Sequence, residues 1–195
     1  MILPNLYTIE LIAAINCAIG STLLILPRIS GWFFLLISAV LYAAVFGAHH
    51  LYANLTLQII FSFINLYGWI CWSFPDQKQP QKWQAISLEP LSIFRDSTLT
   101  LIGGIGIGFF LKNFSDDPAP WMDGLLSGFS LLAQYWMARS FICCWPLWII
   151  VNSCYALQLL FWHLPFSAIL FTYLALISVP GWRKWQMVSF QKSVT

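Results

Sequence analysis

Long apolar runs separated by short polar breaks make up nearly the whole chain. Each run can form a helix that crosses a bilayer, although the fourth is short and rich in Gly. The breaks contain Pro, His or charged residues, which favour the end of an apolar helix. The pattern therefore predicts seven transmembrane helices, at about residues 7–26, 29–49, 52–73, 97–112, 121–138, 145–162 and 165–182.

The composition supports a membrane protein. Of the 195 residues, 59% are hydrophobic and 8% are charged, whereas soluble domains carry about 25% charged residues. The longest polar stretch, about 73–96, is too short for a soluble domain. The net charge of +2 includes no basic stripe, so a nucleic-acid partner is not expected. We therefore expect an all-α integral membrane protein with one transmembrane domain over residues 1–195.

The second part of the chain repeats the first at a fixed offset of 113 residues. One ungapped offset that pairs several Trp residues, a Gly and a His indicates an internal duplication. It pairs Trp32 with Trp145, Tyr42 with Tyr155, His50 with His163, Gly68 with Gly181, Trp69 with Trp182 and Trp72 with Trp185, and it places Glu10 on Asp123.

The basic residues predict an orientation. With the N-terminus outside, eight of the nine Lys and Arg residues fall on the inner side and only Lys112 falls outside. A repeat of three helices ends on the side opposite its start, so two parallel repeats need one helix between them. We expect a 3+1+3 architecture with repeat one at 7–73, a linker helix at 97–112, repeat two at 121–185 and a cytoplasmic C-terminus.

Polar and aromatic residues share helical faces inside the apolar runs. Such spacing places Asn65 with two Trp residues on one face, and Asn152 with two others in the second repeat. A buried amide needs a partner, so these faces look into the protein or into a wet cavity. Bonding between helices is the alternative role for the amides. The expected substrate-binding residues are Gln58, Asn65, Trp69, Trp72, Gln134, Trp145, Trp148, Asn152 and Tyr155.

Other polar and aromatic residues have simpler expected roles. Glu10 and Asp123 begin equivalent helices, where the helix dipole favours a carboxylate. Gln134 continues a polar stripe that Asp123 begins and Ser127 and Ser130 extend. The three His residues lack partners at metal-ligand spacing, so no metal is expected. Four Trp residues near helix ends are expected to anchor the protein at the membrane interface, namely Trp121, Trp136, Trp162 and Trp185.

The charge pattern limits the substrate. No Lys or Arg falls inside a predicted span, although a phosphate would need a cationic clamp. Near mid-span there is also no acidic residue or His of the kind that ion-coupled carriers keep. The sequence favours uncoupled transport of an uncharged or cationic molecule without a cofactor. One alternative is an intramembrane enzyme that uses His163, Asp123 and Ser127, but the sequence shows no nucleophile–base pair to support it. A structural or assembly protein is a further alternative.

Five sequence segments carry a resemblance to a known family. They are Leu51-Tyr-Ala-Asn-Leu-Thr-Leu-Gln58, Asn65-Leu-Tyr-Gly-Trp-Ile-Cys-Trp72, Trp121-Met-Asp123, Trp145-Pro-Leu-Trp148-Ile-Ile-Val-Asn152 and Gly181-Trp-Arg-Lys-Trp185. Over nearly its whole length the chain resembles the PnuC family of nicotinamide riboside transporters, within the Pnu vitamin transporters.

The resemblance implies a SWEET-like fold and a homotrimer in the lipid of a bacterial inner membrane. It also implies facilitated diffusion of nicotinamide riboside, a precursor of NAD, which a cytosolic kinase then traps by phosphorylation. Relatives with the same fold carry thiamine or riboflavin, so these vitamins are alternative substrates.

Overall fold

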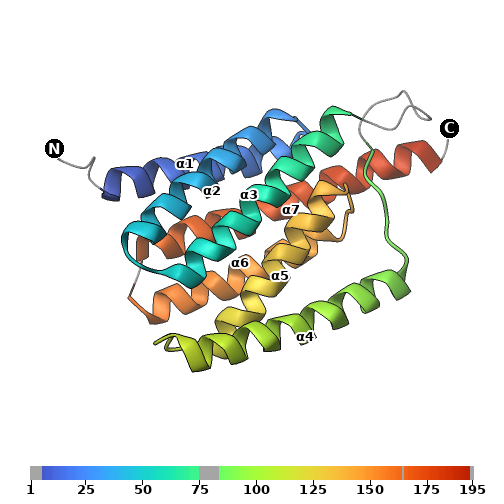
Figure 1. Ribbon diagram of the computed structural model, residues 1–195. Helices are drawn as coiled ribbons and strands as arrows, with labels where there is room; N and C mark the ends of the chain where they lie inside the picture. Colours follow the sequence, from blue (N-terminus) through green and yellow to red (C-terminus); the bar gives the residue numbers. More distant parts are fainter. Residues whose placement is uncertain (1–5, 75–83, 164, 194–195) are drawn as a thin grey trace. The chain divides into compact units, whose positions relative to one another are not determined.

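A computed structural model describes residues 6–74, 84–163 and 165–193, which form seven helices (Figure 1). The helices are α1 (Leu6–Ile25), α2 (Ser30–Ala48), α3 (Tyr52–Ser73), α4 (Pro90–Phe114), α5 (Pro120–Ala138), α6 (Cys144–Phe161) and α7 (Pro165–Ser193). The prediction of an all-helical fold is confirmed. The predicted bounds of α1, α2, α3, α5 and α6 are correct to within about one residue.

The predicted bounds of the other two helices were wrong. The α4 helix begins at Pro90 and not at residue 97, and α7 continues beyond residue 182 to Ser193. The predicted bounds lie where charged residues interrupt the apolar run, at Arg95 and Arg183. A helix satisfies its own backbone hydrogen bonds, however, and can continue into water past such residues. Pro90 also suits the first turn of α4, where a missing N–H costs nothing.

Two His residues end equivalent helices. His50 follows α2 with φ 59° and His163 follows α6 with φ 57°, both in the left-handed region. That conformation commonly ends a helix and is easier for His than for most residues other than Gly, Asn and Asp. The repeat of this His pair therefore has a backbone explanation that needs no metal.

The chain divides into two compact units, Met1–Trp83 and Gln84–Thr195. In the first unit α2 packs against both α1 and α3. Gly20 and Gly31 bring α1 and α2 together, since a Cβ on either one would lie 2.9 Å from the carbonyl oxygen of the other. Ser38 also donates a 2.8 Å hydrogen bond to the Ala13 carbonyl across the same pair of helices.

The second unit contains α4, α5, α6 and α7, each packed against the next. Gly104 and Gly108 of α4 are buried against Gly124 of α5, so these two helices pack closely through glycines. A short segment before α4 joins the turn between α5 and α6. There the Ile86 N–H donates to the Ser140 carbonyl at 2.9 Å, and Ile142 N–H donates to the Ile86 carbonyl at 3.0 Å.

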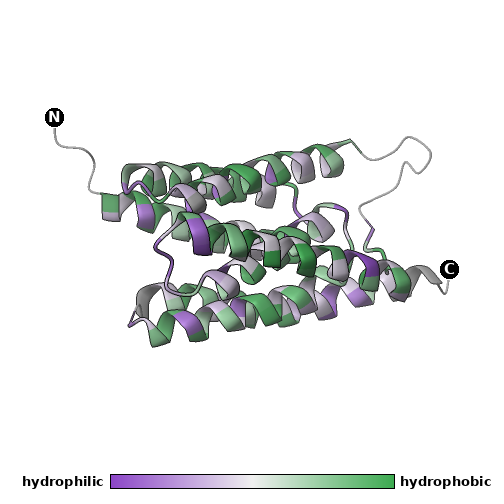
Figure 2. Cartoon of the chain, turned by 60° about the horizontal axis from the view of Figure 1, so that its bottom comes forward, coloured by the Kyte–Doolittle hydropathy of each residue, from purple (hydrophilic) through white to green (hydrophobic). Residues whose placement is uncertain are grey.

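The helices carry much of their apolar surface on the outside. Hydrophobic residues recur along the helices in Figure 2. On α4 alone Phe94, Leu99, Ile102 and Phe109 are each at least 60% exposed. Among the described residues, α1, α2, α4, α6 and residues 54–73 of α3 are long and apolar enough to cross a membrane. Helices with apolar outer faces fit a lipid environment rather than water.

Candidate substrate-binding site

The nine predicted binding residues lie on three helices, divided between the two units. Four are on α3 of the first unit, and the others are on α5 and α6 of the second. Each group is described within its own unit. The helices α3, α5 and α6 contain no Lys or Arg between their first and last residues.

In the first unit Asn65 is buried and binds a neighbouring helix. Its Nδ2 donates a 3.1 Å hydrogen bond to the Leu35 carbonyl of α2. Gln58, two turns earlier on α3, is half-buried. The amide of Asn65 therefore serves the packing of α3 on α2, which was the alternative role for the amides.

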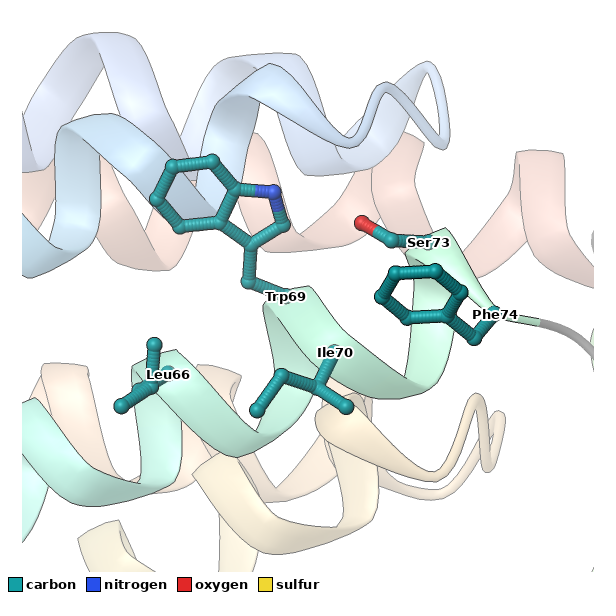
Figure 3. A pocket seen from close by; sticks show the side chains of 5 residues that line it. All are labelled: Leu66, Trp69, Ile70, Ser73 and Phe74. Carbon is teal, nitrogen blue, oxygen red and sulfur yellow. The ribbon is translucent and has the colours of Figure 1, made fainter.

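Trp69 lines a small groove near the end of α3, with Leu66, Ile70, Ser73 and Phe74 (Figure 3). The indole is half-buried and meets the ring of Phe33 edge-on, with centroids 5.7 Å apart. The surface of the groove is almost entirely apolar. Of the two Trp residues on α3, Trp69 is thus the one with a face available to a ligand, since Trp72 is buried.

Trp72 and Trp145 have packing roles, and these roles match in the two units. Trp72 meets Trp32 in a T-shaped pair with centroids 5.4 Å apart, and Trp145 meets Trp185 in a T-shaped pair at 5.2 Å. In each unit a Gly four residues before the α3 or α7 Trp makes room, because a Cβ at Gly68 or Gly181 would lie within 2.7 Å of ring atoms of Trp32 or Trp145, respectively. Edge-on aromatic pairs add about 0.5–1.5 kcal/mol to the burial of their area.

Two of the expected interfacial anchors are instead packed inside the second unit. Trp136 is 2% exposed and Trp185 is fully buried, whereas Trp121 and Trp162 are exposed. The Trp136 indole N–H donates to the Asp96 carboxylate of α4 at 3.2 Å. The anchor prediction was therefore wrong for Trp136 and Trp185, whose rings find protein partners.

In the second unit, polar side chains line the contact between α5 and α6, which we call the α5–α6 seam. The Gln158 Nε2 donates to the Asp123 carboxylate at 2.6 Å, and the Tyr155 hydroxyl lies in hydrogen-bonding reach of Ser127 and Ser130. We define the α5–α6 seam as these residues together with those that share their helical faces by spacing, namely Asp123, Ser127, Ser130 and Gln134 of α5 with Trp148, Asn152, Tyr155 and Gln158 of α6.

The seam follows from the sequence spacing. Its α5 members recur at helical intervals of three or four residues, and its α6 members do the same. The helices are antiparallel, because Asp123 near the start of α5 meets Gln158 near the end of α6. Continuing this register places Gln134 at the depth of Trp148 and Asn152. Asn152 is 3% exposed, and its Oδ1 has no hydrogen-bond partner among the described residues.

Gln158 is the seam residue that sequence reasoning missed. It lies three residues beyond Tyr155 and hence on the same helical face. An amide inside an otherwise apolar run was a usable signal, and its partner Asp123 already began the polar stripe on α5.

Apolar helices with buried polar side chains are typical of a multi-pass α-helical membrane protein. A family model described as nicotinamide mononucleotide transporter matches residues 7–187. The chain belongs to this family, which confirms the family resemblance and the prediction of a transporter rather than an enzyme.

Named relatives support the same class. The nicotinamide riboside transporter PnuC of Escherichia coli (strain K12) is 26% identical over 172 residues, which cover 76% of this chain and 72% of that protein. PnuC of Shigella flexneri matches with the same figures. A crystal structure of the vitamin B3 transporter PnuC has a TM-score of 0.76 at 20% identity and covers 96% of this chain and 84% of that one. At this identity the structural likeness shows the fold.

Proposed function

We propose that the protein is a facilitator that carries nicotinamide riboside across the bacterial inner membrane. The observation that carries the proposal is the lack of any Lys or Arg on α3, α5 and α6, the helices that hold every candidate binding residue. A site of amides, hydroxyls and indoles suits a riboside and not its phosphate. The names of the relatives in Escherichia coli and Shigella flexneri point to the same substrate.

Two aromatic residues are the best candidates for contact with the substrate ring. Trp69 and Trp148 are half-buried, whereas Trp72 and Trp145 already pack edge-on against other indoles. A pyridinium over an indole gains about 2 kcal/mol when water is excluded. Thiamine carries a cationic thiazolium ring and is an alternative, as is riboflavin, and a direct binding assay with the three vitamins separates them.

Transport needs no coupling ion on this proposal. The α3, α5 and α6 sequences hold one ionisable acid or His, Asp123 in the first turn of α5, and coupled carriers keep such groups at mid-membrane. Net uptake then depends on a cytosolic kinase that converts the product to a phosphate. We also propose the homotrimer and the SWEET-like architecture that the family resemblance implies.

The 3+1+3 architecture of parallel repeats is part of the same proposal. The matching Gly–Trp–Trp packing in the two units and the matching left-handed His residues support it. On this proposal α5 and α7 also cross the membrane. The α5 helix does so with a polar stripe, and α7 does so with Pro180, Arg183 and Lys184 in its second half.

The proposed orientation predicts an outer N-terminus and a cytoplasmic C-terminus. A reporter enzyme that works only in the cytoplasm, fused after Thr195, should be active, and one that works only in the periplasm should be silent. Fusions placed between α4 and α5 should show the opposite pattern. Periplasmic activity of a reporter fused after Thr195 would contradict an odd number of membrane-spanning helices, and with it the 3+1+3 architecture.

The α5–α6 seam predicts the effect of two substitutions on binding. Asn152→Leu removes a buried amide, and Trp148→Ala removes a half-buried indole from the same face. Each should weaken riboside binding by about 1–3 kcal/mol, or roughly five- to 150-fold, because a polar partner or a stacked ring is lost. Calorimetric titration of the purified protein measures the change.

Trp162→Ala is the matched control, since Trp162 is exposed at the end of the same helix. It should leave the affinity within about twofold of the wild-type value, as surface substitutions usually change free energies by no more than about 0.5 kcal/mol. Unchanged affinity in Asn152→Leu and Trp148→Ala would assign both residues to helix packing alone.

A further inference from the structure

Asp123 is a half-buried carboxylate without a cationic partner. The Gln158 amide donates a hydrogen bond to it, and the carboxyl group of Asp117 lies within hydrogen-bonding reach and adds a second acid. Lys112, the basic residue nearest in sequence, lies over the Trp121 ring with its Nζ 5.7 Å from the ring centroid. In the described part of the chain no ion pair joins Lys112 to either carboxylate. This end of α5 therefore keeps a negative potential that could attract a cation.

Gln158 gives an independent sign that a ligand binds here. The residue is 6% exposed, and its Nε2 is occupied by Asp123. Its Oε1 is buried and has no hydrogen-bond partner among the described residues. A buried acceptor left without a partner loses its hydrogen bond to water, so it favours a molecule that brings an N–H or O–H.

Asp123 and Gln158 also belong to the same α5–α6 seam as the candidate binding residues. Asp123 and Gln158 form one end of the α5–α6 seam, and Tyr155 with Ser127 and Ser130 comes next along it. Gln134, Trp148 and Asn152 follow deeper in the same register. On the proposed orientation, the Asp123 end of the seam faces the outside, from which the substrate comes.

We propose that Asp123 and Gln158 form an entry site that selects a cationic substrate bearing hydrogen-bond donors. The Asp123 carboxylate attracts the positive ring, and the Gln158 Oε1 accepts a hydrogen bond from an N–H or O–H of the same molecule. The inference rests on the proposed function, in which nicotinamide riboside supplies a pyridinium, a carboxamide and ribose hydroxyls. It adds a charge-selective step that the indoles and amides deeper in the seam do not provide.

The experiment compares nicotinamide riboside with its uncharged dihydro form, which keeps the ribose and the carboxamide. Both are titrated against wild type and Asp123→Asn, a substitution of equal size that still accepts a bond from Gln158. The variant should bind the cationic riboside about tenfold more weakly, because a charge that faces the ligand is lost. Its affinity for the dihydro form should stay within about twofold of wild type, because that form carries no positive charge for the carboxylate to attract.

Glu10→Gln is the matched control. Glu10 occupies the equivalent position in the first repeat but is exposed, so its neutralisation should change neither affinity. Gln158→Met removes the acceptor and keeps the volume, and it should weaken both forms by a similar factor because both carry the same donors. Initial uptake of the cationic form by wild-type proteoliposomes should fall as salt rises, while uptake of the dihydro form stays constant.

The possible outcomes separate the entry site from the proposed function. Equal losses for both forms in Asp123→Asn would make Asp123 a packing residue and would overturn the inference, as would no loss for either form. If Asp123→Asn does not fold, equal salt dependence of the two uptake rates in wild type overturns it instead. A wild-type protein that binds neither form would contradict the proposed function itself.

Discussion

Nicotinamide mononucleotide should bind this protein at least about 1,000-fold more weakly than nicotinamide riboside. The two molecules share the ring and the ribose, so the comparison isolates one phosphate. Burying that dianion without a partner costs several kcal/mol, and each 1.4 kcal/mol changes the affinity tenfold. The α3, α5 and α6 helices offer no Lys or Arg to offset the cost, and Asp123 adds repulsion at the end of the α5–α6 seam.

Competition is the sharpest measurement of this difference. Unlabelled riboside should displace labelled riboside from the purified protein, whereas the mononucleotide should not do so at the same concentration. Uptake into proteoliposomes should be downhill for the riboside and should not respond to imposed proton or sodium gradients. Saturable uptake of the mononucleotide would contradict the proposed substrate and would favour the ligand in the description of the family model.

Phosphate rejection is also what allows a kinase to make transport one-way. If the carrier moves only the unphosphorylated vitamin, phosphorylation inside the cell removes the species that could leave. The riboside gradient then stays inward without an ion to drive it. A carrier that accepted the mononucleotide would release the trapped product, so selectivity at the site and direction of flux have the same physical origin.

Most helices could be predicted because each apolar run ends at Pro, His or charged residues, which also end the helix. The α3 helix has the bounds that the sequence predicts, Tyr52–Ser73. The extra turns of α4 and α7 could not be predicted from hydropathy. They contain Arg95 and Arg183, and a hydropathy pattern marks only the apolar part of a helix. The contact of Ile86 with the α5–α6 turn had no local signal, because it joins residues more than 50 positions apart in the chain through backbone hydrogen bonds.

The candidate site was predictable in part, for a similar reason. Helical spacing predicted a polar stripe on α5, and Asp123, Ser127 and Ser130 of that stripe meet α6. Spacing alone does not tell a ligand contact from a packing contact. The Trp pairs show this, because the Gly four residues before Trp72 and before Trp185 was a signal for packing against Trp32 and Trp145.

Gly124→Ala should destabilise the protein by about 3 kcal/mol or more, a large effect for one methyl group. A Cβ at Gly124 would lie 2.6 Å from the Gly104 carbonyl oxygen and 2.7 Å from the Gly108 Cα. These are backbone atoms of α4, so no side chain can turn away and the two helices must separate. In a membrane, helices gain stability from such close packing because lipid supplies little hydrophobic driving force between them.

Gly103→Ala is the matched control for that substitution. Gly103 lies beside Gly104 in the sequence, but a Cβ there would meet nothing within 4 Å. Alanine should therefore be neutral at position 103, or should stabilise α4 by up to about 1 kcal/mol through its helix propensity. Melting of the purified variants in detergent should show Gly124→Ala lower than wild type by roughly 10 °C and Gly103→Ala unchanged or slightly higher. Equal melting temperatures for the two variants would mean that α4 and α5 do not pack through these glycines.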